Sequence, residues 1–458
     1  MDESQAATRP QRVSNVAPLY YGWVVVALTF IANLTATSIR SAPSVLIHPL
    51  EAEFGWSRTA ISSAASLNLL LLGLFAPLGG WLIDRLGPRR VILGSLAVTA
   101  VGVTGTIFIR ELWQLVFLWG IVLGVASAVT PSLGPSVASR WFVRRRGLAL
   151  GILTNANAAG QVIFLPLLMA LVVYSGWRSA LMIIVVPSVL LLPAILLWLR
   201  DDPKEIGLEP YGAGEKNVFR QSHAAFAARD AKHVAVSSIG EVLRSPSFWL
   251  LSGGFFVCGF TTNGLIGTHL IPHAIERGMP QVTAAWAVGI MGGASFIGTT
   301  FAGWLVDRMD ARKVLAVCYV LRGISLFILP YVVEATGLFA FAVIYGLDWY
   351  ATGPATTAIL AQHYGQEKVG TLFGLVFVSH QLGGALAAVG GGWAHMQFGD
   401  YQYAFLTGAV MGLVGAGLSM MIRPAGRPTP SVPVGAISFG LGHDSLDGGP
   451  LAKITLVK

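Results

Sequence analysis

The chain has little charge: of its 458 residues, only 11% are Asp, Glu, Lys or Arg. A soluble globular domain carries about a quarter charged residues, so this composition excludes an ordinary water-soluble domain. In contrast, 54% of the residues are hydrophobic, and the mean hydropathy is +0.67. Lipid can solvate a surface of this kind, and we therefore expect an integral membrane protein that is embedded in the bilayer.

Cysteine and cofactor-binding motifs are scarce as well. The two cysteines, Cys258 and Cys318, lie within apolar segments, which argues against a disulfide framework. The chain has no nucleotide-binding loop, so we expect neither a cofactor nor ATP as the energy source. It also has no constellation of metal ligands or nucleophiles, which argues against a membrane-embedded enzyme. The net charge of +8 comes from short basic clusters between apolar segments, so we expect no nucleic-acid partner.

Apolar segments of the length that crosses a bilayer, about 20 residues, occur twelve times. We expect spans at 20–48, 58–83, 90–109, 112–138, 147–172 and 178–199, and again at 246–272, 283–306, 313–333, 337–361, 370–395 and 402–422. The predicted fold is an all-α membrane protein with two six-helix halves, 20–199 and 246–422, joined by a polar linker at 200–245. Tails at 1–19 and 423–458 flank the halves, and the second, rich in Pro and Gly, is expected to be poorly ordered.

Basic residues are distributed unequally between the two sides of these spans. One side has Arg9, Arg12, Arg85, Arg89, Arg90, Arg140, Arg144, Arg145, Arg146, Arg308, Arg312 and Lys313, whereas the other has Arg58, Arg110, Arg178 and Arg277. Positive charge accumulates on the cytoplasmic side of membrane proteins. We therefore expect both termini and the linker to be cytoplasmic, in a multi-pass protein of the cell (inner) membrane.

The two halves are related by an internal repeat. The segment "GGWLIDRLGPRRV" after the second span recurs as "AGWLVDRMDARKV" after the eighth, at an offset of 223 residues. The same offset relates further pairs: Trp81 and Trp304, Asp84 and Asp307, Arg89 and Arg312, Glu53 and Glu276, Gly55 and Gly278, Pro131 and Pro354, Gly160 and Gly383, and Gly176 and Gly399. Both halves thus enter the membrane from the same side, which places a substrate site between them near the midplane.

The repeated loop carries a family resemblance. Gly80, Asp84, Arg85, Gly87, Arg89 and Arg90 resemble the loop signature of the major facilitator superfamily, and the segment 303–313 is similar to its second-half counterpart. "YYGWVVV" at the start of the first span and "WFVRRRGLALGI" before the fifth resemble the monocarboxylate transporter family and its bacterial oxalate/formate-type relatives. The resemblance covers nearly all of the chain except the linker and the tail. It implies a twelve-helix transporter that works by alternating access.

The same resemblance assigns a gating role to the repeated loops. It implies that Asp84, Arg85 and Arg89 of the first loop, with Asp307 and Arg308 of the second, form a cytoplasmic gate. The alternative is that the basic residues only set the topology. In the second loop Asp310 stands at the position of Gly87, so we expect that loop to gate less well.

Ionisable residues within spans are functional candidates, because charge is costly in lipid. Arg322 of the ninth span and Asp348 of the tenth lie about 15 and 21 Å from the cytoplasmic helix ends. A long arginine side chain can close that gap, so we favour a buried ion pair over a direct contact of Arg322 with substrate.

Arg40 is the main candidate for substrate binding. It lies in the outer half of the first span, which lines the cavity in the family fold, and the monocarboxylate family places a basic residue in the same stretch. We predict contact with a substrate anion, and the alternative is a position at the outer rim. Histidine is the side chain that can change charge near physiological pH, so His380 is a candidate for coupling or substrate contact, or else a packing residue. The other expected substrate-binding residues are polar: Asn33, Asn157, Asn263 and Gln381.

The eighth span departs from the family pattern. Monocarboxylate transporters carry an Asp and an Arg four residues apart there, and this chain has Ser295 and Thr299. An anion would therefore be held by Arg40 or Arg322, or the substrate is not a simple monocarboxylate. We expect a monomeric secondary transporter of a small, anionic organic solute, driven by protons or by exchange. A transporter of a neutral solute or drug, and a transport-dead sensor on the same fold, stay as alternatives.

Overall fold

The computed structural model describes residues 20–213, 239–365 and 369–424. The first six spans are formed by α1 (Gly22–Phe54), α2 (Arg58–Leu86), α3 (Pro88–Ile107), α4 (Leu112–Leu115), η1 (Val116–Val122), α5 (Leu123–Ser127), α6 (Thr130–Trp141), α7 (Arg146–Ala180) and α8 (Met182–Trp198). The elements from α4 to α6 make up the fourth span. The fifth span ends within α7 at Gly176, whose φ of 79° and ψ of 160° interrupt the helix. The expected tail at 1–19, residues 425–458 of the expected tail at 423–458, and the linker residues 214–238 lie outside the described residues.

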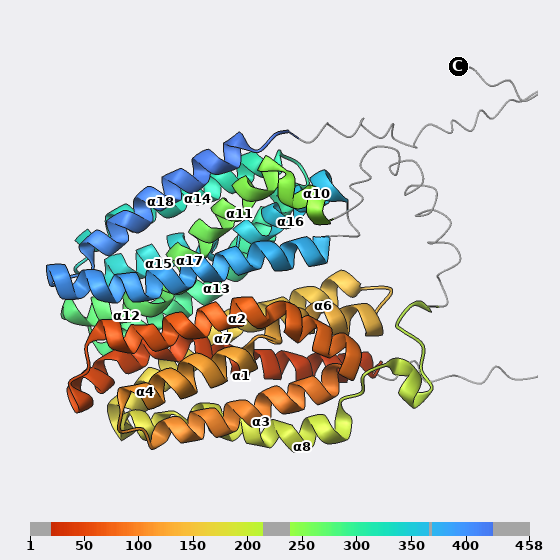
Figure 1. Cartoon of the computed structure of the whole chain (residues 1–458), viewed down its shortest axis with the longest axis horizontal. Helices are drawn as coiled ribbons and strands as arrows, with labels where there is room; N and C mark the ends of the chain where they lie inside the picture. The colour runs from red at the N-terminus through yellow and green to blue at the C-terminus, as the bar shows by residue number, and fades with distance from the viewer. Residues whose placement is uncertain (1–19, 214–238, 366–368, 425–458) are drawn as a thin grey trace, which may run out of the picture. The chain divides into compact units, whose positions relative to one another are not determined.

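The second six spans follow in the same order. They are formed by α11 (Pro246–Gly259), η4 (Phe260–Ile266), α12 (Gly267–Glu276), α13 (Gln281–Val306), α14 (Ala311–Ile328), η5 (Leu329–Tyr331), α15 (Ala335–Trp349), α16 (Thr352–Tyr364), α17 (Val369–Phe398) and α18 (Gln402–Met421). Two short helices, η2 (Pro203–Ile206) and α10 (Ile239–Arg244), belong to the linker. Within the described residues, ten helices are long and apolar enough to cross a membrane, and the shorter α8 is apolar too. Figure 1 shows the two groups of helices, red to yellow and green to blue.

The tenth span is not the continuous helix expected at 337–361. It is broken between α15 and α16, at Tyr350 and Ala351. The proline ring of Pro354 clashes with the carbonyl of the residue four positions earlier, which is Tyr350. Pro131, its counterpart in the first half, lies just after the break between α5 and α6.

The backbone confirms the internal repeat. Gly55 and Gly278, which follow the first and seventh spans, have φ values of 67° and 83°. Gly176 and Gly399, which precede the sixth and twelfth spans, both have a φ of 79°. Only glycine adopts such values readily, so equivalent turns explain these two pairs.

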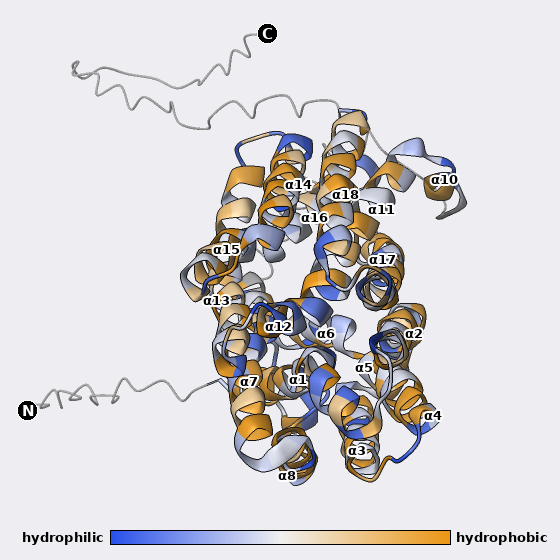
Figure 2. Cartoon of the chain, turned by 90° about the vertical axis from the view of Figure 1, so that its left-hand side faces the viewer, coloured by the Kyte–Doolittle hydropathy of each residue, from blue (hydrophilic) through white to orange (hydrophobic). Residues whose placement is uncertain are grey.

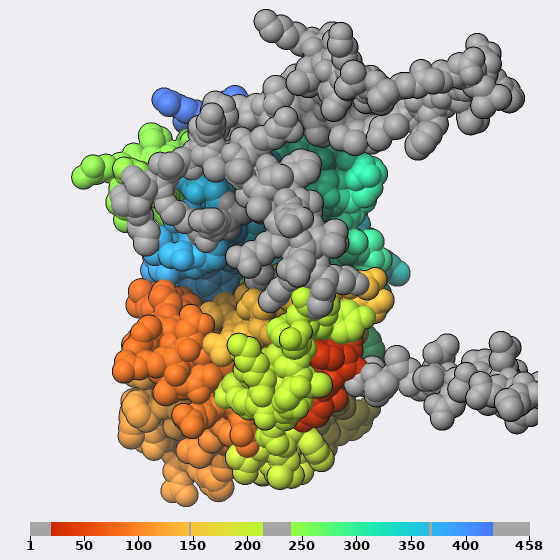
Figure 3. All heavy atoms as spheres, turned by 90° about the vertical axis from the view of Figure 1, so that its right-hand side faces the viewer, coloured from red at the N-terminus to blue at the C-terminus, as the bar shows by residue number. Residues whose placement is uncertain are grey.

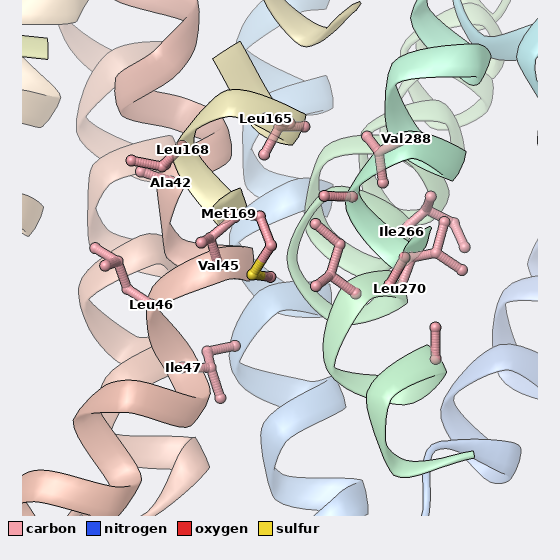
Figure 4. Close-up of a cluster of buried hydrophobic side chains, with 14 of the residues drawn as sticks. Ala42, Val45, Leu46, Ile47, Leu165, Leu168, Met169, Ile266, Leu270 and Val288 are labelled. Carbon is pink, nitrogen blue, oxygen red and sulfur yellow. The ribbon is translucent and has the colours of Figure 1, made fainter. Parts of the chain in front are cut away.

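The apolar core distinguishes the two ends of the helix bundle. We call the end where α1 stops and α2 begins the Arg58 end, and the end with the loops 84–90 and 307–313 the basic end. Towards the Arg58 end, one core cluster contains residues of both halves. Figure 4 shows part of it, with Leu165 and Met169 on the side of the first half and Ile266 and Leu270 on the side of the second. Towards the basic end each half has its own cluster. The halves are therefore packed together at the Arg58 end.

Hydropathy distinguishes the inside of the helix bundle from its outer surface. Figure 2 shows orange, hydrophobic residues along most of the helices. Large exposed apolar side chains, such as Ile297, Leu190 and Val101, are 63%, 65% and 71% exposed. In water such exposure would be costly, whereas in a bilayer these side chains face lipid.

The first residues of the linker are held against the first half. Tyr211 donates its backbone N–H to the Trp141 carbonyl at 2.9 Å and accepts at its own carbonyl from Val143 N and Arg144 N. The Tyr20 hydroxyl donates to the Glu209 carbonyl at 2.8 Å. Figure 3 shows this yellow-green segment beside the red start of the chain. The two motifs "YYGWVVV" and "WFVRRRGLALGI" thus lie against each other.

Candidate functional site

Arg40 lies on α1 and is held by the first half. Its Nη2 donates to Thr37 Oγ1 at 3.2 Å and makes a short hydrogen bond to Asn157 Oδ1 of α7. The Thr37 hydroxyl donates to the same Asn157 oxygen at 2.8 Å. The two helices approach this closely because residue 160 is glycine: a Cβ atom there would lie 2.9 Å from Thr37 Cβ. Arg40 is thus fixed by neutral partners on two helices.

No carboxylate within the described chain forms an ion pair with Arg40. A residue of the second half, Tyr350, lies at the break between α15 and α16. Gln161, one turn beyond Asn157 on α7, donates to the Tyr350 hydroxyl at 3.4 Å. Arg40 is half-buried, so its charge lies at the interface between the halves without a counter-charge.

The polar candidates of the second half form a separate chain of hydrogen bonds. His380 Nδ1 lies 2.8 Å from Gln381 Oε1, and Asn263 Nδ2 donates to that oxygen at 3.5 Å. Gln381 reaches the first half, where its Nε2 donates to the Leu69 carbonyl at 3.4 Å. The His380 ring stacks on Phe377 with a centroid separation of 5.6 Å. No hydrogen bond in the described part of the chain joins His380 to Arg40.

Asn33 is the remaining substrate candidate. It lies on the same face of α1 as Arg40, about two turns nearer the basic end. Its side chain is buried, and its Oδ1 has no hydrogen-bond partner among the described atoms. A buried acceptor of this kind calls for a partner such as an ordered water or a ligand donor.

Arg322 and Asp348 form a buried ion pair. Arg322 Nε lies 2.6 Å from Asp348 Oδ2, and the two side chains are 0% and 4% exposed. The guanidinium also donates to the backbone carbonyls of Asp348 and Trp349, at 2.9 and 3.3 Å, and to Thr261 Oγ1 at 3.3 Å. Four of the five guanidinium N–H donors are used in this way, and the side chain is fully buried, which leaves Arg322 little to offer a solute.

The first signature loop carries one ion pair and a helix cap. Asp84, 81% exposed, lies 3.7 Å from Arg140 at the end of α6. Arg85 stacks over Trp81 at 5.1 Å. The backbone N–H of Arg89 donates to Asp201 Oδ1 at 2.6 Å, so a linker residue caps the start of α3.

The second loop achieves its cap differently. Asp310 accepts from the backbone N–H of Arg312 at 3.0 Å and pairs with the Arg312 side chain at 2.5 Å. The hydrogen bond from Arg312 lowers the pKa of the Asp310 carboxyl below its ordinary value. Asp310 therefore caps α14 with a carboxylate from the start of that same helix, whereas α3 receives its capping carboxylate from Asp201 of the linker. Asp307 makes no ion pair with any described residue, and the equivalent of Arg140 is His363.

Sequence reasoning missed a polar cluster at the Arg58 end. Arg58, 8% exposed, contacts both carboxylate oxygens of Glu51 at 2.6 and 3.0 Å, and makes a short ion pair with Glu276 of the second half. It also contacts His395 Nε2 at 3.0 Å and donates to the Tyr401 hydroxyl at 3.1 Å. Its position at a helix start made Arg58 look like a loop charge.

Metal binding finds no support in the described residues, where no group of three or more His, Cys, Asp or Glu side chains could hold an ion.

Comparison with known families decides the identity of this architecture. A family model described as Major Facilitator Superfamily matches residues 28–298 and 270–454. The chain belongs to the major facilitator superfamily. It is therefore a multi-pass membrane transporter and not an enzyme.

Several relatives of this superfamily protein carry a transporter name. The uncharacterized MFS-type transporter YcxA of Bacillus subtilis (strain 168) is 28% identical over 419 residues, which are 88% of this chain and 94% of that protein. Monocarboxylate transporter 11 of Homo sapiens is 28% identical over 412 residues, with 86% and 82% covered. Monocarboxylate transporter 12-B of Danio rerio is 25% identical over 399 residues, with 84% and 83% covered.

Solved structures share the fold. A bacterial homolog to the human lysosomal transporter Spinster, in an inward-facing and occupied conformation, matches with a TM-score of 0.70 at 16% identity. The match covers 91% of this chain and 100% of that one.

Proposed function

We propose that this major facilitator protein moves a small, anionic organic solute across the membrane by alternating access. The observation that carries the proposal is the guanidinium of Arg40, which lies half-buried at the interface with no carboxylate partner. A buried charge without compensation is costly, and an anionic ligand would supply the missing counter-charge. The relatives named as monocarboxylate transporters support a carboxylate as that anion.

The contrast with Arg322 supports Arg40 as the binding residue. Arg322 is fully buried and compensated by Asp348. Because Ser295 and Thr299 replace the charged pair of the eighth span, Arg40 is the one intramembrane arginine left for the solute in the part of the chain that the structure describes. A guanidinium can bind both oxygens of one carboxylate. We therefore infer a monoanion as the preferred solute.

Alternating access is supported by the unequal ends of the bundle. The halves share a core at the Arg58 end and have separate cores at the basic end. We propose that the basic end is cytoplasmic and that the solute leaves or enters Arg40 from this side in the conformation seen here. The Asp84–Arg140 pair and the second loop would then act when the basic end closes.

The energy source of transport and a second candidate substrate also belong to the proposed function. Transport would be coupled to protons or run as exchange, with His380 as the intramembrane histidine next to the polar chain of the second half. The replacement of the family's eighth-span arginine by Thr299 favours a neutral solute as the second candidate.

A reconstituted system tests the proposal. Purified protein in proteoliposomes is given labelled monocarboxylates, dicarboxylates and neutral sugars, with and without a pH gradient. We expect uptake of one or more monocarboxylates above protein-free liposomes. Uptake of neutral sugars alone would overturn the anion assignment. A pH-gradient dependence that is lost in His380→Gln would support proton coupling through this residue.

A further inference from the structure

We propose that Arg58 is a positioning residue that releases Glu276 and keeps Glu51 during transport, and that its ion pair with Glu276 holds the Arg58 end closed. The inference rests on the alternating access proposed above, since it assigns the residue that controls one of the two ends. It concerns charges at the helix ends and not the solute site around Arg40.

The internal repeat explains why Glu276 has a partner in the other half. Its equivalent in the first half, Glu53, is satisfied within its own half: Arg178 lies 2.6 Å away, and Trp177 donates to it at 2.7 Å. At the offset of 223 residues, the position of Arg178 is taken by Tyr401. Glu276 therefore has no arginine of its own half at that position and pairs with Arg58 instead.

Each partner also has a neighbour that stays with it when the halves separate. Glu51 belongs to the same half as Arg58 and contacts its guanidinium with both oxygens, at 2.6 and 3.0 Å. His395 belongs to the same half as Glu276 and lies 3.0 Å from its carboxylate. Opening thus breaks one ion pair between the halves without leaving the guanidinium uncompensated, which would be far more costly.

The surrounding packing places the pair where it can act. Below Arg58, Ser62 of α2 faces Gly392 of α17, where an added Cβ would lie 3.1 Å from the Ser62 hydroxyl. One turn further, the Ser66 hydroxyl donates to the Ala385 carbonyl at 2.7 Å. The interface between α2 and α17 is therefore closed directly beneath the ion pair, and its opening requires Arg58 to release Glu276.

A cysteine reporter measures the opening that follows when Arg58 releases Glu276. Ser62 is 1% exposed and its hydroxyl has no partner among the described atoms, so Ser62→Cys disturbs little. The rate of its reaction with a water-soluble maleimide, measured on the purified chain in nanodiscs without solute, reports opening of the Arg58 end. The chain without this substitution is the blank, since Cys258 and Cys318 are buried.

Substitutions of Glu276 and Glu51 should change the labelling rate in opposite directions. Arg58→Gln and Glu276→Gln should raise the labelling rate by about tenfold, because the closed state loses its ion pair. Glu51→Gln should lower the rate below that of the parent, because only the open state depends on Glu51 as the sole counter-charge. Glu53→Gln and Arg178→Gln remove a pair of the same kind at the same end, but within one half, and should leave the rate unchanged.

Two results would overturn the proposal. Unchanged labelling in Glu276→Gln, with folding verified by gel filtration, would show that the pair does not hold the end closed, and this variant decides the matter even if Arg58→Gln fails to fold. Faster labelling in Glu51→Gln would show that Glu51 helps to hold the halves together and does not stabilise Arg58 in the open state. Neither measurement uses a solute, so a failure to bind anions would leave them unaffected.

Discussion

Two arginines within the spans of this protein differ in their counter-charge, and this difference separates their roles. Arg322 is paired with Asp348 at 2.6 Å and has no exposed surface. Arg40 is held by Thr37 and Asn157, which carry no charge. A buried charge whose partner is in place is already compensated, whereas one that is left without a partner is available to a ligand.

Replacement of Arg40 by lysine should weaken binding of the solute anion without affecting the fold. The ammonium group of lysine cannot form two parallel hydrogen bonds to one carboxylate, so we expect the Kd for the transported monocarboxylate to rise by about 10- to 100-fold. Arg40→Ala should abolish transport. A binding titration on purified protein measures both, with the exposed Arg110→Lys as the matched control. Unaltered affinity in Arg40→Lys would place Arg40 outside the binding site.

The Arg322–Asp348 pair should show strong coupling in a double-mutant cycle. Arg322→Gln or Asp348→Asn alone leaves one buried charge unpaired, at a cost of about 3–5 kcal/mol. The double variant removes both charges and should unfold at a higher temperature than either single variant. Thermal unfolding in detergent provides the comparison. If the two single effects simply add, the pair contributes no coupling energy.

At the scale of the helices, prolines and glycines decide where elements break and end. Pro354 breaks the tenth span at Tyr350, and this break brings the Tyr350 hydroxyl into contact with Gln161 of the other half. Gly87 adopts a φ of 85°, and a Cβ atom there would collide with the Asp201 carboxylate that caps α3. The contacts made by Tyr350 and Asp201 thus depend on local backbone geometry.

Replacement of Gly87 by alanine should destabilise the protein. The side chain would be strained at this φ and would displace Asp201 from the start of α3, at a cost of about 1–3 kcal/mol. Gly94, within the same helix, has open space at its Cβ position and a helical backbone. Gly94→Ala should therefore be neutral or slightly stabilising. Apparent unfolding temperatures compare the two, and an equal response would rule out the steric role of Asp201.

Sequence patterns predicted well those features of the fold that depend on one span at a time. Length and hydropathy gave twelve spans, and the repeat gave their equivalence, because both are local or periodic properties. The proximity of Arg322 and Asp348 followed from their depths on neighbouring spans. The break at Tyr350 was missed, since proline is tolerated within membrane helices and its presence alone does not fix a break.

Contacts between the halves were beyond the reach of such patterns. Arg58 and Glu276 are separated by 218 positions, and each lies at a helix end where a charge normally faces water. The signal that could have revealed the pair is the change from Arg178 to Tyr401 at equivalent positions, which deprives Glu276 of a partner. Similarly, Thr37 and Gln161 make their hydrogen bonds where two helices approach closely, and their residue types alone do not predict such an approach.

At the scale of the molecule, the two halves repeat a fold but not its charges. The Asp84–Arg140 pair of the first half has Asp307 and His363 as its equivalents, and no ion pair joins these two in the described structure. The Glu53–Arg178 pair has Glu276 and Tyr401. Each change removes an ion pair from the second half, so the charges at equivalent positions of the two halves are asymmetric.

Loss of the first-loop aspartate should therefore impair transport more than loss of the second. Asp84→Asn removes an ion pair, whereas Asp307→Asn removes a carboxylate without one. Asp84 is 81% exposed, and an exposed pair contributes only about 0–1 kcal/mol to stability, so we expect little change in unfolding temperature. Initial uptake rates at matched expression measure the difference. Equal losses in the two variants would contradict the asymmetry.

The missing counter-charge of Arg40 has an electrical consequence. In the proposed mechanism a monoanion bound there would neutralise the guanidinium, so a carrier loaded with the anion alone would move no net charge as it reorients, whereas the empty carrier would present one positive charge to the membrane field. Moving a full elementary charge through the field involves about 2.3 kcal/mol per 100 mV. The membrane voltage should thus act on the return of the empty carrier, and exchange of one anion for another should be insensitive to voltage.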